Sequence, residues 1–348
     1  MRITGVRTVL YEYPLRRPIG DVQAHGMRRM AELAVFLDTD AELVGVAIAA
    51  LDCALWDLRA KGNGVPLWRE LGASSGRVAA YASGLDMALS DEELRTYYQG
   101  MAERFGIRAG KLKVGRDLDR DLQRLTVMRD ALAAGSAGSR PSLMIDANEF
   151  WTPKQAVRRI DELEREFDLV WAEEPVRRDD HRGLARVSRA VRTAVATGEN
   201  LTAVSQFVPL LTHEAVDVVQ VAVHGAGITQ PLRIFEMADA FGLPVALVNS
   251  PGRYAAHVGT ALPNHLMMEV IDPGPDAVFS TDDRLEDGSL ILGEAHGLGV
   301  VFDEDRLALH AVDRPSVDSM GVRYRRAADS GISEPGITVV RGAGDSDA

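Results

Sequence analysis

Short apolar segments that end in polar or charged residues recur along this chain at the length of a strand–helix unit. The positions that end them, from 113 to 269, lie 20 to 33 residues apart. Between them the sequence has amphipathic helical spacing, for example over residues 117–134, 153–164 and 230–241. Alternating strands and helices predict a parallel sheet, and eight such units predict a closed α/β barrel of the TIM type. In that architecture the active site lies at the carboxyl ends of the strands.

The eight candidate strands are short runs rich in valine, leucine, isoleucine and alanine. They cover residues 78–83, 111–114, 143–148, 169–174, 194–199, 216–223, 244–249 and 266–271. Several are followed directly by a carboxylate or a lysine, so a barrel would gather these groups at one end.

The first part of the chain has a different pattern. Residues 1–46 predict a small antiparallel meander. Its apolar runs are Ile3–Tyr13, Ala31–Asp38 and Leu43–Val46. The polar segment from Arg16 to Arg28 predicts a mobile loop between the first two runs, and residues 47–72 have the apolar spacing of helix.

Composition excludes several classes of function. The formal net charge of −12 over 348 residues argues against a nucleic-acid partner. No stretch is long enough to span a membrane, and the N-terminus lacks the apolar core of a signal peptide. The single cysteine, Cys53, excludes an internal disulfide and lies in a helical apolar pattern. We therefore expect a cytoplasmic protein that acts on a small molecule.

A pair of lysines ends the second candidate strand. Lys111 and Lys113 are two residues apart, so strand alternation points both side chains to the same face, into the barrel mouth. Two neighbouring ammonium groups disfavour each other's charge, which lowers a lysine pKa toward neutrality and makes a usable general base. The alternative interpretation is a solvent-exposed basic pair, which is common on helices.

Three carboxylates end the next three strands. They are Asp146, Glu173 and Glu199. Carboxylates that converge on one point repel each other unless a divalent cation neutralises them, and an all-oxygen set suits Mg²⁺ or Mn²⁺ better than zinc. Each could instead cap the following helix, but three in succession after the lysine pair favour the metal.

A metal beside a base suits the removal of a proton from the carbon next to a carboxylate. A carboxylate substrate would chelate the metal, which lowers the pKa of the adjacent C–H bond. A lysine would take the proton, and the metal would hold the charge of the resulting enediolate.

In their order along the chain, these motifs resemble those of the enolase superfamily, specifically its mandelate racemase and muconate lactonizing enzyme branch. They are Lys111-x-Lys113, Asp146-x-Asn148, Glu173-Glu174-Pro175 and Gly198-Glu199-Asn200, with supporting stretches at 54–58, 64–67, 227–229 and 296–300. The resemblance covers nearly the whole chain. It implies a modified (β/α) barrel under an α+β capping domain formed by both chain ends, and a homo-oligomer.

On this resemblance we expect three regions. These are an N-terminal capping domain at 1–75, a barrel at 76–295, and a C-terminal segment at 296–348 that returns to the cap and ends in an extended or partly disordered tail. The cap is shorter near Val46 and Ala47 than in the family, where a longer helical stretch includes a loop that closes over the substrate. Either this segment is deleted or the sequence as printed omits it.

The resemblance also implies roles for individual residues. The metal ligands are Asp146, Glu173 and Glu199. Lys113 is the base and Lys111 is the residue that lowers its pKa. Asn148 and Glu269 fall where the family contacts substrate.

The opposing acid or base of the family is missing. Asn249 replaces the histidine at the end of the seventh strand, and Ala222 stands where an aspartate would orient it. Asn249 cannot transfer a proton, so we expect it to orient substrate. His224, two residues after Ala222, is the candidate for the vacant role because strand alternation would place it inward, although a rim histidine bound to backbone is the commoner case. Tyr254 and His257 are weaker candidates.

With one convincing base, the chain favours elimination over inversion. We expect Lys113 to take the α-proton and a β-hydroxyl to leave as water, from a sugar acid or a hydroxylated amino acid such as a hydroxyproline. A racemase or epimerase of an α-substituted carboxylic acid, with His224 as second base, is the first alternative. A non-catalytic metal-binding scaffold is the second.

Overall fold

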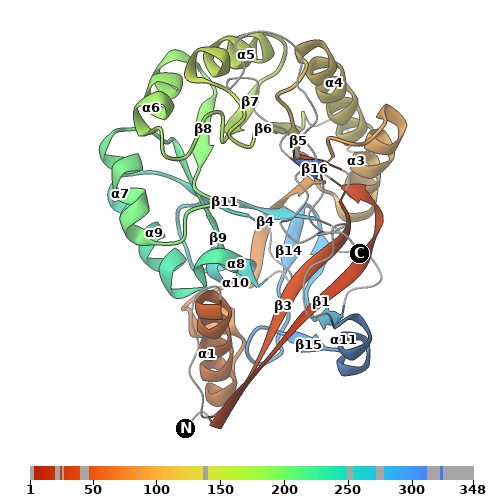
Figure 1. Cartoon of the computed structure of the whole chain (residues 1–348), viewed down its shortest axis with the longest axis vertical. Coiled ribbons are helices and arrows are strands. Elements are labelled where there is room, and N and C mark those ends of the chain that lie inside the picture. The colour runs from red at the N-terminus through yellow and green to blue at the C-terminus, as the bar shows by residue number, and fades with distance from the viewer. Residues whose placement is uncertain are drawn as a thin grey trace, which may run out of the picture.

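A computed structural model describes residues 4–19, 24–25, 27–39, 47–84, 86–135, 140–248, 254–271, 278–311 and 322–323. Within them a ring of parallel strands forms a closed barrel, with helices on its outside (Figure 1). Its strands are β4 (Arg77–Ser83), β5 (Ala109–Lys113), β6 (Ser142–Asp146), β7 (Leu169–Glu173), β8 (Ala194–Thr197), β9 (Val218–Ala222), β10 (Val245–Val248) and β11 (His265–Val270). The barrel closes where β11 pairs with β4, with Glu269 opposite Tyr81. The predicted barrel is therefore confirmed.

Helices connect successive strands. They are α3 (Asp91–Phe105), α4 (Leu118–Ala134), α5 (Pro153–Glu166), α6 (His181–Ala190), α7 (Val204–Thr212), α8 (Val223–Ala226), α9 (Thr229–Ala240) and α10 (Ala255–Thr260). Their ends follow local chemistry. Ser90 and Glu93 form a reciprocal capping box at the start of α3, and Gly106 ends that helix in the left-handed conformation. The Asp117 carboxylate accepts the Arg120 N–H at the start of α4.

Strand alternation divides the barrel into an outer and an inner face. Outward side chains such as Leu112 and Ile145 pack against the helices in the main core. Inward side chains form a second apolar cluster across the barrel. It comprises Tyr81, Ala109, Met144, Trp171, Ala196, Val218 and Ala246. This apolar cluster lies directly below the polar residues at the carboxyl ends of the strands, and we call it the apolar floor of the site.

The N-terminal segment contributes two long antiparallel strands, β1 (Thr4–Ile19) and β3 (Met27–Thr39). The prediction of a mobile loop over Arg16–Arg28 was wrong at both ends, because the paired strands extend into it. The third predicted run, Leu43–Val46, lies outside the described residues. Two helices follow, α1 (Ala47–Asn63) and α2 (Leu67–Glu70), as the sequence predicted for 47–72.

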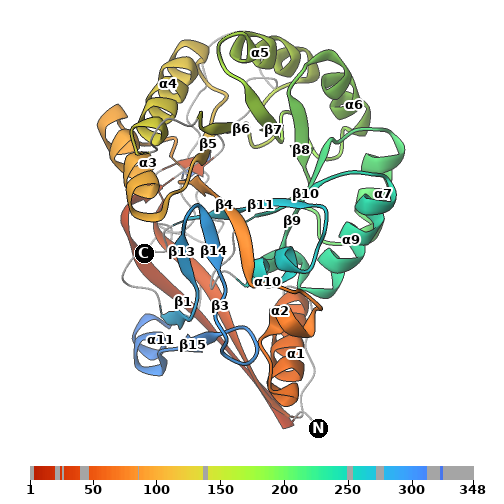
Figure 2. The same cartoon turned by 180° about the vertical axis from the view of Figure 1, so that it is seen from behind.

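The C-terminal part adds short strands around the barrel edge. They are β12 (Phe279–Thr281), β13 (Arg284–Glu286), β14 (Ser289–Ile291) and β15 (Val300–Phe302), followed by α11 (Glu304–His310). Figure 2 shows β14 beside β4, to which it pairs antiparallel. In the predicted tail, β16 (Val322–Arg323) pairs with β2 (Ala24–His25), so this part of the C-terminal segment lies beside the N-terminal segment.

Cys53 on α1 is buried, as predicted, and burial raises the pKa of its thiol to about 12. The thiolate, which is the reactive form, is therefore disfavoured. None of the helices in the described part of the chain is both long and apolar enough to cross a membrane.

An aspartate of α1 joins the N-terminal helices to the barrel. The Asp52 carboxylate accepts the backbone N–H groups of Ile228 and Thr229, at 2.6 and 2.8 Å, and the Thr229 hydroxyl. It therefore caps α9 from a distant part of the sequence. Gly227 is required beside it, because it has a φ of +72° and a Cβ there would lie 2.6 Å from the Asp52 Oδ2.

Replacement of Asp52 tests the contact between α1 and the start of α9. We expect Asp52→Ala to lower the free energy of unfolding by about 1–2 kcal/mol, because two N–H groups of α9 lose their acceptor. Urea unfolding followed by far-UV circular dichroism measures the change. Asp52→Asn keeps an acceptor oxygen and should lose less; equal stability of Asp52→Ala and the wild type would contradict the cap.

Candidate active site

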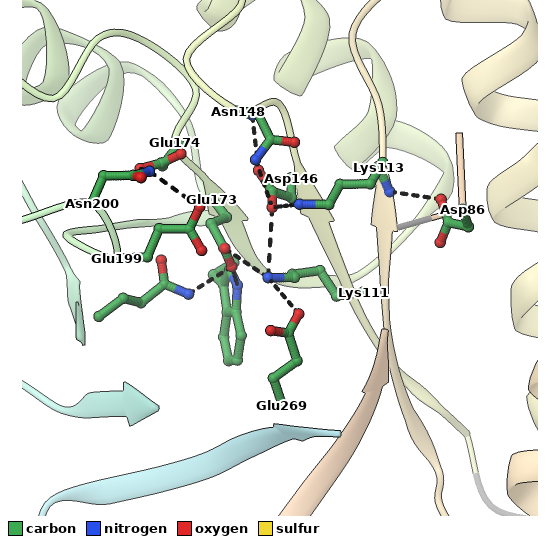
Figure 3. Close-up of polar contacts among 12 residues, drawn as sticks. Asp86, Lys111, Lys113, Asp146, Asn148, Glu173, Glu174, Glu199, Asn200 and Glu269 are labelled. Carbon is green, nitrogen blue, oxygen red and sulfur yellow. Dashed lines mark hydrogen bonds and ion pairs between the residues drawn. The ribbon is translucent and has the colours of Figure 1, made fainter. Parts of the chain in front are cut away.

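Four strand ends place charged side chains at the centre of the barrel mouth (Figure 3). The Lys111 ammonium lies 2.6 Å from a Glu173 carboxylate oxygen, 3.1 Å from Glu269 and 3.6 Å from Asp146. The Lys113 ammonium lies 2.5 Å from Asp146 Oδ2. All five side chains are buried. The structure thus brings together the lysine pair, two of the three predicted metal ligands, and Glu269.

The third predicted ligand, Glu199, follows β8 and points toward the same cluster (Figure 3). The Asn200 amide donates to Glu174 at 2.8 Å and to Glu199 at 3.2 Å, which holds these two carboxyl groups beside each other. Asn148 donates its backbone N–H to Asp146 Oδ1 at 2.8 Å and its amide to Oδ2 at 3.4 Å. Asp146 and Glu199 are therefore each oriented by an asparagine that follows a strand.

Backbone strain is concentrated at the same rim. Asn148, Glu149 and Glu174 have positive φ values of 42°, 62° and 41° although none is a glycine. Such conformations are unfavourable for residues with a Cβ and persist where the surroundings hold them, commonly at functional sites.

Negative charge exceeds positive charge in this cluster. Four carboxyl groups, those of Asp146, Glu173, Glu199 and Glu269, face two ammonium groups, so full ionisation would leave two negative charges without a counter-charge. Burial, together with the neighbouring carboxylates, raises the pKa of Glu173 to about 8 even though Lys111 lowers it. Burial and Asp146 also raise the pKa of Glu199.

The donor set therefore fits one divalent cation, because oxygen ligands and two excess negative charges match Mg²⁺ in chemistry and in charge. Within the described residues, no three acidic, cysteine or histidine side chains already converge at coordinating distance. Lys111 bridges Asp146 and Glu173 instead.

The predicted depression of the Lys113 pKa was wrong for the protein without a cation. Burial lowers the pKa of Lys113, and Lys111 lowers it further, but the adjacent Asp146 carboxylate raises it by more. The pKa of Lys113 therefore lies above its usual value. The pKa of Lys111 is also raised, because Glu173 and Glu269 raise it by more than burial lowers it. The carboxylates, which the lysine-pair argument left out, decide the balance.

Sequence reasoning missed three buried side chains that hold the strand carrying the lysines. Arg124 Nη1 donates to the Lys113 carbonyl at 2.6 Å, and its Nη2 donates to Asp86 Oδ1 at 2.7 Å. Asp86 Oδ1 also accepts the Lys113 backbone N–H at 3.2 Å. The Tyr98 hydroxyl lies 2.6 Å from the Lys111 carbonyl, to which it donates, and 2.9 Å from Asp86 Oδ2. Arg124 carried a signal, because it lies on the face of α4 that includes the buried Leu125 and Met128.

Sequence reasoning also missed two donors to Glu173. The Trp171 indole N–H and the Gln220 amide both contact its Oε2, at 3.2 and 2.6 Å. The signal for Gln220 was its inward parity with Ala222 in an otherwise apolar strand.

The far side of the barrel mouth carries apolar side chains where it is described. Ala222 ends β9, and alternation from the inward Ala246 places Val248 inward at the end of β10. The argument that placed His224 inward was wrong, because β9 ends at Ala222 and His224 belongs to α8, so strand alternation does not reach it. Its side chain and the whole of Asn249 lie outside what the structure describes.

His257 is bound to backbone rather than aimed at the barrel mouth. Its Nδ1 accepts the Trp68 N–H at 3.1 Å, and its Nε2 lies 3.2 Å from the Leu298 carbonyl. Burial lowers its pKa to about 4, so it is neutral near pH 7. It therefore joins α2 to the C-terminal segment, and the proposal of a catalytic role for it is dropped.

Comparison with known proteins agrees with this geometry. Residues 93–306 match the family model described as enolase C-terminal domain-like, and residues 22–72 match the mandelate racemase / muconate lactonizing enzyme N-terminal domain. The chain is 35% identical over 277 residues to 3,6-anhydro-alpha-L-galactonate cycloisomerase of Streptomyces coelicolor, covering 76% of this chain and 72% of that protein. It is 33% identical over 262 residues to L-talarate/galactarate dehydratase of Salmonella typhimurium, covering 74% of this chain and 63% of the dehydratase, slightly under two thirds.

A solved structure shows the same fold. L-talarate dehydratase from Polaromonas sp. JS666, complexed with Mg and L-glucarate, has a TM-score of 0.75 and 26% identity, covering 90% of this chain and 98% of that one. The fold and the charged residues at the strand ends are those of a (β/α)-barrel enzyme. The chain belongs to the mandelate racemase and muconate lactonizing enzyme branch of the enolase superfamily, as the motifs indicated.

The buried Asp86–Arg124 pair makes a quantitative prediction. We expect Arg124→Met to lower the free energy of unfolding by about 3–5 kcal/mol, because Asp86 would stay buried without its charged partner. Arg120→Met is the matched control on the same helix, since Arg120 pairs with Asp91 near the surface and should lose less than about 1 kcal/mol. Equal losses in the two variants, measured by urea unfolding, would contradict the assignment.

Proposed function

We propose that this enzyme removes the proton next to the carboxylate of a sugar acid and eliminates water from the resulting enediolate. The observation that supports it best is the asymmetry of the barrel mouth. Lys111, Lys113 and the carboxylates occupy one side, whereas Ala222 and Val248 end the described strands on the other. Elimination can proceed with one base, and the geometry offers one.

The proposed metal ligands are Asp146, Glu173 and Glu199, with Mg²⁺ as the cofactor and Mn²⁺ as a possible substitute. When bound, the cation would supply the positive charge that acidifies the α-carbon and balances the charge of the enediolate. The two excess negative charges of the cluster support this assignment.

Lys113 is the proposed base. Its pKa is raised mainly by contact with Asp146, so engagement of that carboxylate elsewhere would leave burial and Lys111 to lower the pKa. Arg124, Asp86 and Tyr98 fix the backbone at both lysines, which limits the positions that the Lys113 ammonium can reach. Once protonated, Lys113 could donate its proton to the departing hydroxyl on the same face.

The substrate class rests on the relatives. Two of them are named as a sugar-acid dehydratase and a sugar-acid cycloisomerase, and the solved dehydratase holds L-glucarate. We therefore propose hydroxylated mono- and dicarboxylic acids as the first candidate substrates, and hydroxyprolines as the second. Asn148, Glu269 and Asn249 remain the proposed substrate contacts, and a homo-oligomer and the domain limits at 75 and 295 remain predictions.

The first test is a screen in D₂O with Mg²⁺, followed by mass spectrometry. The compounds are galactarate, L-talarate, D-glucarate and hydroxyprolines. We expect loss of one water from at least one acid, slowed about 10²- to 10⁴-fold by Lys113→Ala because the base is lost. Lys154→Ala is the control, since Lys154 is an exposed lysine at the start of α5 and should react like the wild type.

The outcomes separate the alternatives. Deuterium incorporation without loss of water would favour the racemase or epimerase and make His224 the next residue to replace. Turnover that Lys113→Ala leaves unchanged would contradict the assigned base. Metal binding with neither deuterium exchange nor loss of water in any of these acids would count against the proposed substrate class. It would favour the alternative of a non-catalytic metal-binding scaffold.

A further inference from the structure

One oxygen of Glu173 is held by two uncharged donors from the barrel interior. Oε2 accepts from the Gln220 amide at 2.6 Å and from the Trp171 indole at 3.2 Å, while Oε1 faces Lys111 at 2.6 Å. Figure 3 shows the ion pair between Glu173 and Lys111. Trp171, Glu173 and Gln220 are all fully buried.

The barrel builds this contact from two strands that are not neighbours. Gln220 lies on β9 and Glu173 on β7, with β8 between them. The inward residue of β8 at this level is Ala196, which is small enough for the amide to pass. Gly198 lies against the Gln220 backbone, since a Cβ there would meet the Gln220 carbonyl oxygen at 2.3 Å. Small residues on β8 thus make room for Gln220.

The Trp171 ring is also fixed. It packs edge-on against Tyr81, with centroids 5.4 Å apart and planes at 83°. An indole N–H can only donate, so Oε2 is the acceptor of this hydrogen bond. The two donors therefore hold Oε2 without adding charge to the site.

Folding alone does not require Gln220. Its amide oxygen is buried and has no hydrogen-bond partner in the part of the chain that the structure describes. An unsatisfied buried acceptor costs about 1–3 kcal/mol, which an apolar side chain of similar size would avoid. A role at Glu173 accounts for a polar side chain here.

We propose that Trp171 and Gln220 are positioning residues for the metal ligand Glu173. Their hydrogen bonds to Oε2 would hold the Glu173 carboxylate in one orientation when a cation binds. The inference rests on the proposed metal role of Glu173 and extends it to two residues that do not touch the cation. Partners of this kind that orient a ligand typically contribute 10- to 100-fold to metal affinity.

Metal affinity is measurable without any substrate. Binding of Mn²⁺, followed by electron paramagnetic resonance of the free ion, is compared in wild type, Gln220→Met and Trp171→Phe. We expect each variant to bind about tenfold more weakly than the wild type, because Glu173 loses one of its two fixed donors. Trp68→Phe is the matched control. The Trp68 indole also donates from a partly buried position, but to the Gly293 carbonyl, so its loss should leave the affinity unchanged.

Tryptophan fluorescence adds a signature that a merely structural role would not give. Addition of Mg²⁺ should change the emission of wild type and Trp68→Phe and leave that of Trp171→Phe almost unchanged, because only Trp171 donates to a proposed ligand. Wild-type affinity in stably folded Gln220→Met and Trp171→Phe would overturn this inference alone. Failure of the wild type to bind Mn²⁺ or Mg²⁺ would overturn the proposed metal site together with it.

Discussion

The pairing of two buried lysines with a larger number of buried carboxylates is the interaction on which the site depends. Isolated buried charges are costly, so Lys111 and Lys113 are stable inside the barrel because Asp146, Glu173 and Glu269 surround them. The pairing is incomplete, since full ionisation leaves two negative charges in excess. Burial and the neighbouring carboxylates raise the pKa of Glu173, and the same excess of carboxylates favours a divalent cation at the proposed site.

The barrel can hold this concentration of charge because its inner face carries the charged side chains and its outer face packs against the helices. Inward side chains carry the reacting groups over an apolar floor, whereas support comes from outside the barrel. Arg124 and Tyr98 reach from the helices α4 and α3 to the backbone of β5. Side chains at the centre are therefore held by their strands, and the strands are held by the helix layer. Rigid support of this kind would suit Lys113 as the proposed base, because a base must be held in position against one carbon.

Local sequence patterns were sufficient for the barrel and for the membership of the charged cluster. Strand parity placed Lys111 and Lys113 together, and strand ends identified Asp146 and Glu173. What failed depended on contacts between distant segments. The pKa of Lys113 is raised by a carboxylate from another strand. Asp86 is held in the site by its ion pair with Arg124, which lies 38 residues away in the sequence. The parity argument for His224 failed for a local reason, because a helical turn stands where that argument required a strand, and the role of His224 stays a prediction.

The proposal of elimination rests on the positions of the proton-transfer groups at the described strand ends. Inversion of a carbon centre requires a group that removes the proton from one face and another that returns it to the opposite face. Elimination requires removal of the α-proton and protonation of the departing oxygen, and both can occur on the face of Lys113. Across the barrel the described strands end in Ala222 and Val248, which can do neither. The proposed elimination therefore uses groups at the described strand ends, whereas inversion would require a donor that the described ends of β9 and β10 do not supply.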